Sequence, residues 1–172
     1  MPKAIIRPSP PTKLHQMRIV PAGEGRSILA LSTEDGRIIF YDLKTTVEGD
    51  KEDEEVPQCA AVGQLGGNQA GFTGRIKDFE VLQHKAGAPL ILVTGSSDGA
   101  VRLWKCNMSE ILEGAVEGEV RQVGTPIGTH ETGHRITCLV AFVMDGPAEA
   151  ADDEDELAQG VPEEAGSDSE DE

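Results

Sequence analysis

One stretch of the sequence has the residue types and spacing of a zinc-dependent hydrolase site. His130, Glu131 and His134 stand in the order H-E-x-x-H. That spacing binds zinc when a helix places both imidazoles on one face, with the glutamate as general base. Pro126 precedes the stretch, Gly133 interrupts it and no third ligand is evident, so a helix is disfavoured here. We predict a loop without a metal and without a catalytic residue, and a metalloprotease is the remote enzyme alternative.

Two serines near the end of the sequence fit the pattern that acidophilic kinases phosphorylate. Ser167 and Ser169 each have an acidic residue three places on. Phosphorylation would add about −1.5 to −2 charge at each site. A solvated tail that no kinase modifies is an equally good interpretation.

The three cysteines offer little chemistry. Cys59, Cys106 and Cys138 are an odd number and form no C-x-x-C pair, which indicates reduced, intracellular thiols rather than a disulfide framework or a metal site. Cys138 lies in an apolar run, and we predict that it belongs to a core. Phosphate-binding loops and nucleophile elbows are absent from the sequence, so we predict no cofactor.

The elements that position these residues are predicted to be short strands. The runs 89–94 and 100–106 are rich in Leu, Ile and Val, and the turn between them contains Asp98-Gly99, a strong hairpin signal. Both runs are continuously apolar, so both faces of their sheet must be covered. Because no segment with helical periodicity lies nearby, we predict an all-β fold in which small sheets stack, as in a β-propeller.

The hairpin pattern occurs twice. Residues 29–42 align without gaps to residues 92–105, with Asp35 on Asp98 and Tyr41 on Trp104, an offset of 63 residues. A repeat of this kind predicts two similar four-stranded units. The first has expected strands at 13–20, 27–32, 37–43 and 59–65, and the second at 75–83, 89–94, 100–106 and 119–128.

The remaining segments complete the predicted organisation. Residues 1–12 are a Pro-rich lead-in. Residues 108–116 have room for one helical turn with Ser109 as a cap, but Gly114 and Gly118 favour a loop. Residues 129–144 supply one inner strand of a third unit and nothing more. Two units and one strand cannot close a ring of typically 4–8 units. We therefore expect the chain to be the C-terminal part of a longer protein whose missing units lie upstream.

The negative charge is concentrated in two segments. The chain has a net charge of −16, and of its 31 acidic residues 13 lie in residues 145–172 and 6 in residues 48–55. Outside these two segments the chain has 12 acidic and 14 basic residues, so that part is nearly neutral. Blocks of like charge are typical of disordered, solvating segments. We predict a disordered acidic tail from residue 145 and an acidic insertion at 46–57.

No stretch approaches 18 apolar residues, so no membrane partner is expected.

The repeated hairpin resembles part of a WD repeat. Val93–Lys105 is similar to its second hairpin half, and Tyr41-Asp42 stands where the Trp-Asp dipeptide usually lies. Such a repeat has about 40–45 residues in four strands, and the acidic insertion accounts for the greater spacing here. Residues 74–79, 93–105 and 135–139 together resemble the C-terminal end of the p21-activated-kinase-interacting protein family and its fungal ribosome-assembly counterparts.

The resemblance implies a buried polar network with a structural role. Its members are Thr94 on one strand, Asp98 in the turn and Trp104 on the next strand, because buried N–H and O–H groups need partners. The Gly-His pair that opens a WD repeat is Gly74-Arg75 in the second unit and Gly133-His134 in the third, so the histidine of the second unit is missing. The full set of residues that the resemblance marks as structural is Thr94, Ser96, Asp98, Trp104, Asp35, Tyr41 and His134.

The function that the resemblance implies is binding rather than catalysis. We expect a non-enzymatic nucleolar or nuclear scaffold in assembly of the large (60S) ribosomal subunit, holding a ribosomal protein or an assembly factor. Restraint of a p21-activated kinase is the alternative, and a truncated gene product without independent function is another. Relatives carry Lys-rich tails where this one is acidic, so direct nucleic-acid binding is not expected, because phosphate contacts need Lys or Arg.

Overall fold

The computed structural model describes residues 4–47, 57–85, 87–113, 115–116 and 119–144. The predicted acidic tail with Ser167 and Ser169, and most of the predicted insertion, lie outside the described residues. In the described part, no helix is long and apolar enough to cross a membrane.

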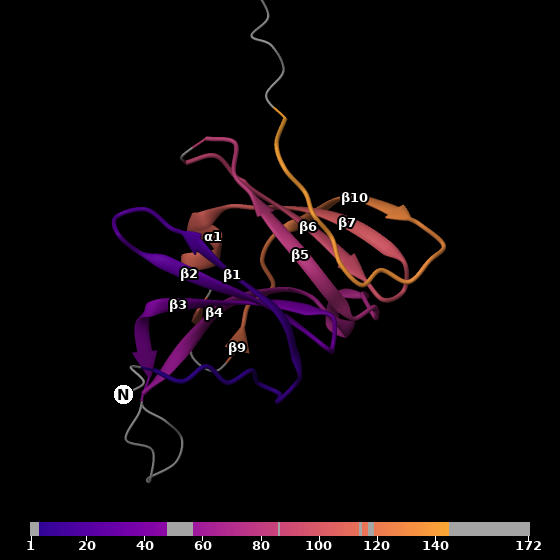
Figure 1. Ribbon diagram of the computed structural model, residues 1–172. Coiled ribbons are helices and arrows are strands. Elements are labelled where there is room, and N and C mark those ends of the chain that lie inside the picture. The colour runs from indigo at the N-terminus through magenta and orange to yellow at the C-terminus, as the bar shows by residue number, and fades with distance from the viewer. Residues whose placement is uncertain (1–3, 48–56, 86, 114, 117–118, 145–172) are drawn as a thin grey trace, which may run out of the picture.

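The chain folds into two antiparallel four-stranded sheets with almost no helix, so the all-β prediction is confirmed (Figure 1). The first sheet has the order β1-β2-β3-β4, with strands β1 (Leu14–Pro21), β2 (Ser27–Thr33), β3 (Arg37–Val47) and β4 (Gln58–Gly66). The second has the order β10-β7-β6-β5, with strands β5 (Ile76–Leu82), β6 (Leu90–Ser96), β7 (Ala100–Cys106) and β10 (Thr125–Glu131). The smaller elements are η1 (Asn68–Ala70), α1 (Met108–Leu112) and the hairpin of β8 (Ala115–Val116) and β9 (Glu119–Val120).

The two large sheets bury a shared apolar core, as the continuously apolar strands predict. Alternate residues of β2 and β3, such as Ile28 and Phe40, belong to the same buried cluster as Leu92 of β6 and Trp104 of β7. Leu92 and Trp104 are direct cross-strand neighbours. Complete burial of one such side chain contributes about 1.5–3 kcal/mol to stability, so the stacking of the sheets is the main source of stability for both.

The lead-in covers the other face of the first sheet. Ile5 forms a parallel bridge with Gln58 of β4, in which the Ile5 N–H donates to the Pro57 carbonyl at 2.9 Å and the Ile5 carbonyl accepts from Cys59 at 2.8 Å. Ala4 and Ile6 pack against a second apolar cluster formed by Leu29, Leu31, Ile39, Tyr41 and Cys59. The first sheet is therefore covered on both faces, by the second sheet and by the start of the chain.

Two predictions for the second half of the chain were wrong. The outer strand of the second sheet is β10 (Thr125–Glu131) rather than 119–128, because pairing with β7 begins at Thr125 and shifts register between Pro126 and Gly128. Residues 108–112 form the short helix α1 instead of a loop, since Ile111 is completely buried in the shared core. That apolar contact outweighs the helix-breaking effect of the glycines that follow.

The inner strand predicted within 129–144 is also absent from the structure as a strand. Beyond Glu131, residues 135–144 are assigned no strand and pair with no described strand. A strand requires a ladder of hydrogen bonds to a neighbour, and the described part of the chain offers none there. Cys138 in this segment is exposed, whereas Cys59 and Cys106 are buried, so its predicted place in a core was wrong.

Candidate functional site

The turns that join the central strands of the two sheets have the same hydrogen-bond pattern. In the second sheet the Ser96 hydroxyl donates to Asp98 and, at 3.0 Å, to the Ala100 carbonyl. In the first sheet the Thr33 hydroxyl donates to Asp35 at 2.5 Å and to the Arg37 carbonyl at 2.9 Å. Each hydroxyl lies two residues before its aspartate. The 63-residue repeat of the sequence is thus a repeat of turn geometry.

An arginine fixes each aspartate in its ionised form. Arg102 Nη2 lies 3.0 Å from Asp98 Oδ2, and Arg37 Nη2 lies 2.7 Å from Asp35 Oδ2. Burial of each carboxylate opposes its ionisation, but the bonds from the arginine and the hydroxyl outweigh it, so the pKa of both aspartates lies below the usual value. Asp35 and Asp98 hold turns, and neither is available as a general acid near neutral pH.

The predicted bond between the tryptophan and the threonine is present in the second sheet. Trp104 Nε1 donates to Thr94 Oγ1 at 3.1 Å, and the threonine hydroxyl donates to the Arg102 carbonyl at 3.3 Å. In the first sheet Leu31 takes the place of Thr94, and Tyr41 that of Trp104. The Tyr41 hydroxyl is buried without a hydrogen-bond partner among the described residues, and burial raises its pKa to about 12. The first sheet therefore keeps the turn but has lost the cross-strand bond.

The structure keeps His134 apart from these networks and does not form a zinc-protease helix. His130 and Glu131 lie at the exposed end of the extended strand β10, so the stretch is not helical, but it begins in a strand rather than in the predicted loop. The backbone N–H and carbonyl of His134 bond to the Thr132 hydroxyl, and the same carbonyl lies against Gly99 of the second turn. Within the described residues, no group of three or more His, Cys, Asp or Glu is placed to hold a metal ion.

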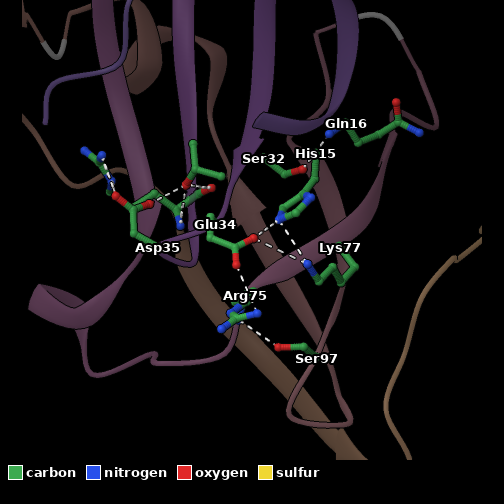
Figure 2. Close-up of polar contacts among 10 residues, drawn as sticks. His15, Gln16, Ser32, Glu34, Asp35, Arg75, Lys77 and Ser97 are labelled. Carbon is green, nitrogen blue, oxygen red and sulfur yellow. Dashed lines mark hydrogen bonds and ion pairs between the residues drawn. The ribbon is translucent and has the colours of Figure 1, made fainter. Parts of the chain in front are cut away.

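A polar seam joins the two sheets along their inner strands (Figure 2). His15 of β1 and Lys77 of β5 both reach Glu34, with Lys77 Nζ 3.4 Å from Glu34 Oε2 and 3.1 Å from His15 Nε2. Arg75 Nη1 lies 3.0 Å from the other oxygen of Glu34. An ammonium only donates and a carboxylate only accepts, so His15 Nε2 either donates to Glu34 or accepts from Lys77. Glu34 thus ties together the inner edges of both sheets.

The seam continues from the first sheet through Asp78 to the 135–144 segment. Gln16 Nε2 of β1 donates to Asp78 Oδ1 at 3.3 Å, and the Leu139 N–H donates to Asp78 Oδ2 at 2.9 Å. Arg18 of β1 donates to Glu80 at 2.8 Å and stacks 5.8 Å over the Phe79 ring. Asp78 therefore bonds to β1 on one side and to the 135–144 segment on the other.

The outer face of the second sheet repeats an apolar face that is buried elsewhere in the molecule. In the first sheet Ile28, Ala30, Ile38 and Phe40 contact the second sheet and are at most 1% exposed. Their counterparts 63 residues on are Ile91, Val93, Val101 and Leu103, which form the outer face and are only half-buried. The 135–144 segment crosses this face at Gly95, where an added Cβ would lie 2.8 Å from Ile136 Cγ2. Its own apolar side chains Val140, Phe142 and Met144 are 71–83% exposed.

The turn residues were predictable from the sequence, but the seam was not. Glu34 and Lys77 lie 43 residues apart, and Gln16 and Asp78 lie 62 residues apart. The one available signal was the charge pattern of residues 75–80, in which four charged residues surround Ile76 and Phe79. Nothing local in the sequence indicates which partners those charges meet.

Neither a protein-family model nor a curated protein matches this chain. The inference of function therefore rests on the sequence pattern and the geometry of the two sheets.

Proposed function

We propose that the two sheets are neighbouring blades of a WD-repeat propeller. The observation that carries this proposal is the second turn, where Ser96 bonds Asp98 and Trp104 bonds Thr94 at 3.1 Å, together with its partial copy 63 residues earlier. Meandering four-stranded units that bury their faces only by stacking are typical of such arrays.

The uneven coverage of the two outer faces supports further blades. The first sheet is capped by Ala4 and Ile6, whereas the outer face of the second sheet carries a single unpaired segment. On this face the Leu139 N–H donates to Asp78, and on the side of the first sheet Gln16 donates to the same carboxylate. We infer that the 135–144 segment, which forms no strand in the described structure, takes the place of an inner strand and would pair with strands of additional blades.

The function that we propose is a non-catalytic scaffold in large ribosomal subunit assembly, located in the nucleolus. The first support is the resemblance of residues 74–79, 93–105 and 135–139 to the ribosome-assembly family. The second is that residues 74–79 lie at the seam and residues 135–139 lie on the outer face of the second sheet. Such a scaffold would bind a ribosomal protein or an assembly factor through apolar and charged surfaces. The aspartates of the turns would serve the fold and not chemistry.

Co-sedimentation tests this role. Tagged protein is expressed in cells, and lysates are separated on sucrose gradients, with the expectation that the protein migrates with pre-60S particles. Leu103→Glu, which charges the outer face of the second sheet, should release it. Met17→Glu is the matched control, because Met17 is 58% exposed on β1 and away from that face.

Each other outcome contradicts the proposal in its own way. Migration only at the top of the gradient, with no particle bound, favours a truncated product without independent function. Capture of a p21-activated kinase without ribosomal partners favours kinase restraint. Equal release by both variants would show that the outer face of the second sheet is not the surface used.

A further inference from the structure

A cavity of about 500 Å³ opens at the end of the first sheet, away from the seam and from the outer face of the second sheet. Its wall includes Arg37, Gln64 and Gln122, and the Gly66-Gly67 turn that ends β4. Volumes of this order are typical of sites that bind small ligands or short segments of a partner.

The single cationic side chain in the wall is already neutralised and saturated. Arg37 Nε and Nη2 donate to Asp35, Nη1 donates to the Ser9 carbonyl at 2.9 Å and to Gln64 Oε1 at 3.0 Å, and Nη2 reaches the Pro10 carbonyl at 3.4 Å. These contacts use the guanidinium's five N–H groups. Asp35 is the one acidic lining residue, so the cavity wall carries no net charge. An anionic ligand would therefore find no free cation here.

Gln64 presents an amide donor to which no described residue offers an acceptor. The residue is only 6% exposed, and Arg37 fixes its orientation, because a guanidinium can only donate and must face the amide oxygen. The amide nitrogen is consequently turned away from Arg37, and no described residue accepts a hydrogen bond from it. An acceptor within a ligand would therefore form a hydrogen bond that the described residues do not supply.

An acceptor stands in the same wall. Gln122 Nε2 donates to the Gly66 carbonyl at 3.2 Å, and no described residue donates to the amide oxygen of this exposed side chain. Gly66 and Gly67 have φ values of +75° and +80°, and a side chain at either would meet the Gly36 carbonyl or the Arg37 side chain, so the glycines allow these parts of the wall to pack closely. One free donor and one free acceptor in an uncharged cavity are the complement of an amide group.

We propose that this cavity binds the main chain of an extended peptide segment. A carbonyl of the segment accepts from Gln64 Nε2, and an N–H donates to Gln122 Oε1. A sugar would also offer hydroxyl groups, but no aromatic side chain lines the cavity to stack on its ring among the described residues. The proposal rests on the cavity alone and does not depend on the ribosomal role.

The test is an NMR titration of the full ¹⁵N-labelled chain with the peptide acetyl-Gly-Ala-Gly-amide. The side-chain NH₂ signals of Gln64, assigned by their loss in Gln64→Glu, should shift saturably as peptide is added. Gln64→Glu keeps the shape and the bond to Arg37 but replaces the free donor with an acceptor, so affinity should fall about tenfold or more. Gln69→Glu is the matched control, since it adds the same charge at the exposed rim of the cavity, and it should leave the affinity within about twofold.

Three results would overturn the proposal. The Gln64 signals could stay unchanged at millimolar peptide. Acetate, inorganic phosphate or glucose could shift them as strongly as the peptide does, which would assign the cavity to another ligand class. Gln69→Glu could weaken binding as much as Gln64→Glu, which would make the effect one of charge alone. If Gln64→Glu fails to fold, the comparison of the four probes on the wild-type chain still decides the outcome.

Discussion

Removing one hydroxyl from each sheet should change the stability in opposite directions. Tyr41 and Trp104 occupy equivalent positions in the repeat, yet the Tyr41 hydroxyl is buried without a partner while Trp104 Nε1 bonds Thr94 at 3.1 Å. Tyr41→Phe deletes an unsatisfied group and leaves the ring in place. Thr94→Val keeps the shape of the side chain and leaves the indole N–H unpaired.

The size of both effects follows from the cost of burying an unpaired polar group, about 1–3 kcal/mol. Tyr41→Phe removes that cost, so the free energy of unfolding should rise by about 1–3 kcal/mol. Thr94→Val introduces it at Trp104 and also loses the bond to the Arg102 carbonyl, so the free energy should fall by a similar amount. With a urea dependence of about 2 kcal/mol per molar, each change moves the unfolding midpoint by about 1 M.

Urea unfolding followed by circular dichroism measures both variants, and the fluorescence of Trp104, the single tryptophan, provides a second probe. Coincident transitions would establish that the midpoints can be compared. A Tyr41→Phe protein less stable than the wild type would refute the reasoning, because it would mean that the hydroxyl has a partner such as a buried water. A Thr94→Val protein of unchanged stability would show that the repeat's cross-strand bond contributes nothing.

Three further measurements test the geometry. Tyr41 is the single tyrosine, with a pKa raised to about 12 by burial, so the free energy of unfolding does not depend on its ionisation below its unfolded pKa of about 10 and falls as pH rises toward 12; absorbance at 295 nm should show this late ionisation, and a midpoint at 10 would place the hydroxyl in water. The pKa of Asp98 is lowered, so its contribution is present above about pH 4 and is lost as pH falls; Asp98→Asn should weaken the acid dependence of the urea midpoint, and an unchanged dependence would contradict the assigned bonds. Gly74→Ala places a Cβ 2.2 Å from the Asp98 carboxylate and should destabilise by about 1–3 kcal/mol, whereas Gly128→Ala, which meets nothing within 4 Å, should not; equal effects would exclude the contact as the cause.

The central hairpins were predictable because their signals are local. Residues 100–106 were predicted as a strand and β7 spans Ala100–Cys106. An Asp-Gly turn between two apolar runs determines both strands and their register within about fifteen residues of sequence. The stacking of two sheets also followed from the sequence, since strands that are apolar on both faces must be covered on both.

Elements without such local signals were predicted wrongly. Helix α1 forms because Ile111 reaches the core shared by both sheets, and a five-residue helix has no periodicity long enough to detect. Residues 135–144 have the composition of a strand but lack a neighbouring strand to pair with in the described structure. Cys138 shares that segment and is exposed for the same reason.

The sequence by itself determined the class of the fold, the two hairpins and the turn chemistry of Asp35 and Asp98, because these depend on contacts between residues a few positions apart. Only the tertiary structure decided that Glu34 joins His15, Lys77 and Arg75 across the seam, and that Arg37 turns the Gln64 amide into a free donor. Those contacts bring together residues 19–62 positions apart. Their geometry is set by how the two sheets and the lead-in pack, and side-chain orientation in packed contacts of this kind is not encoded in any local pattern.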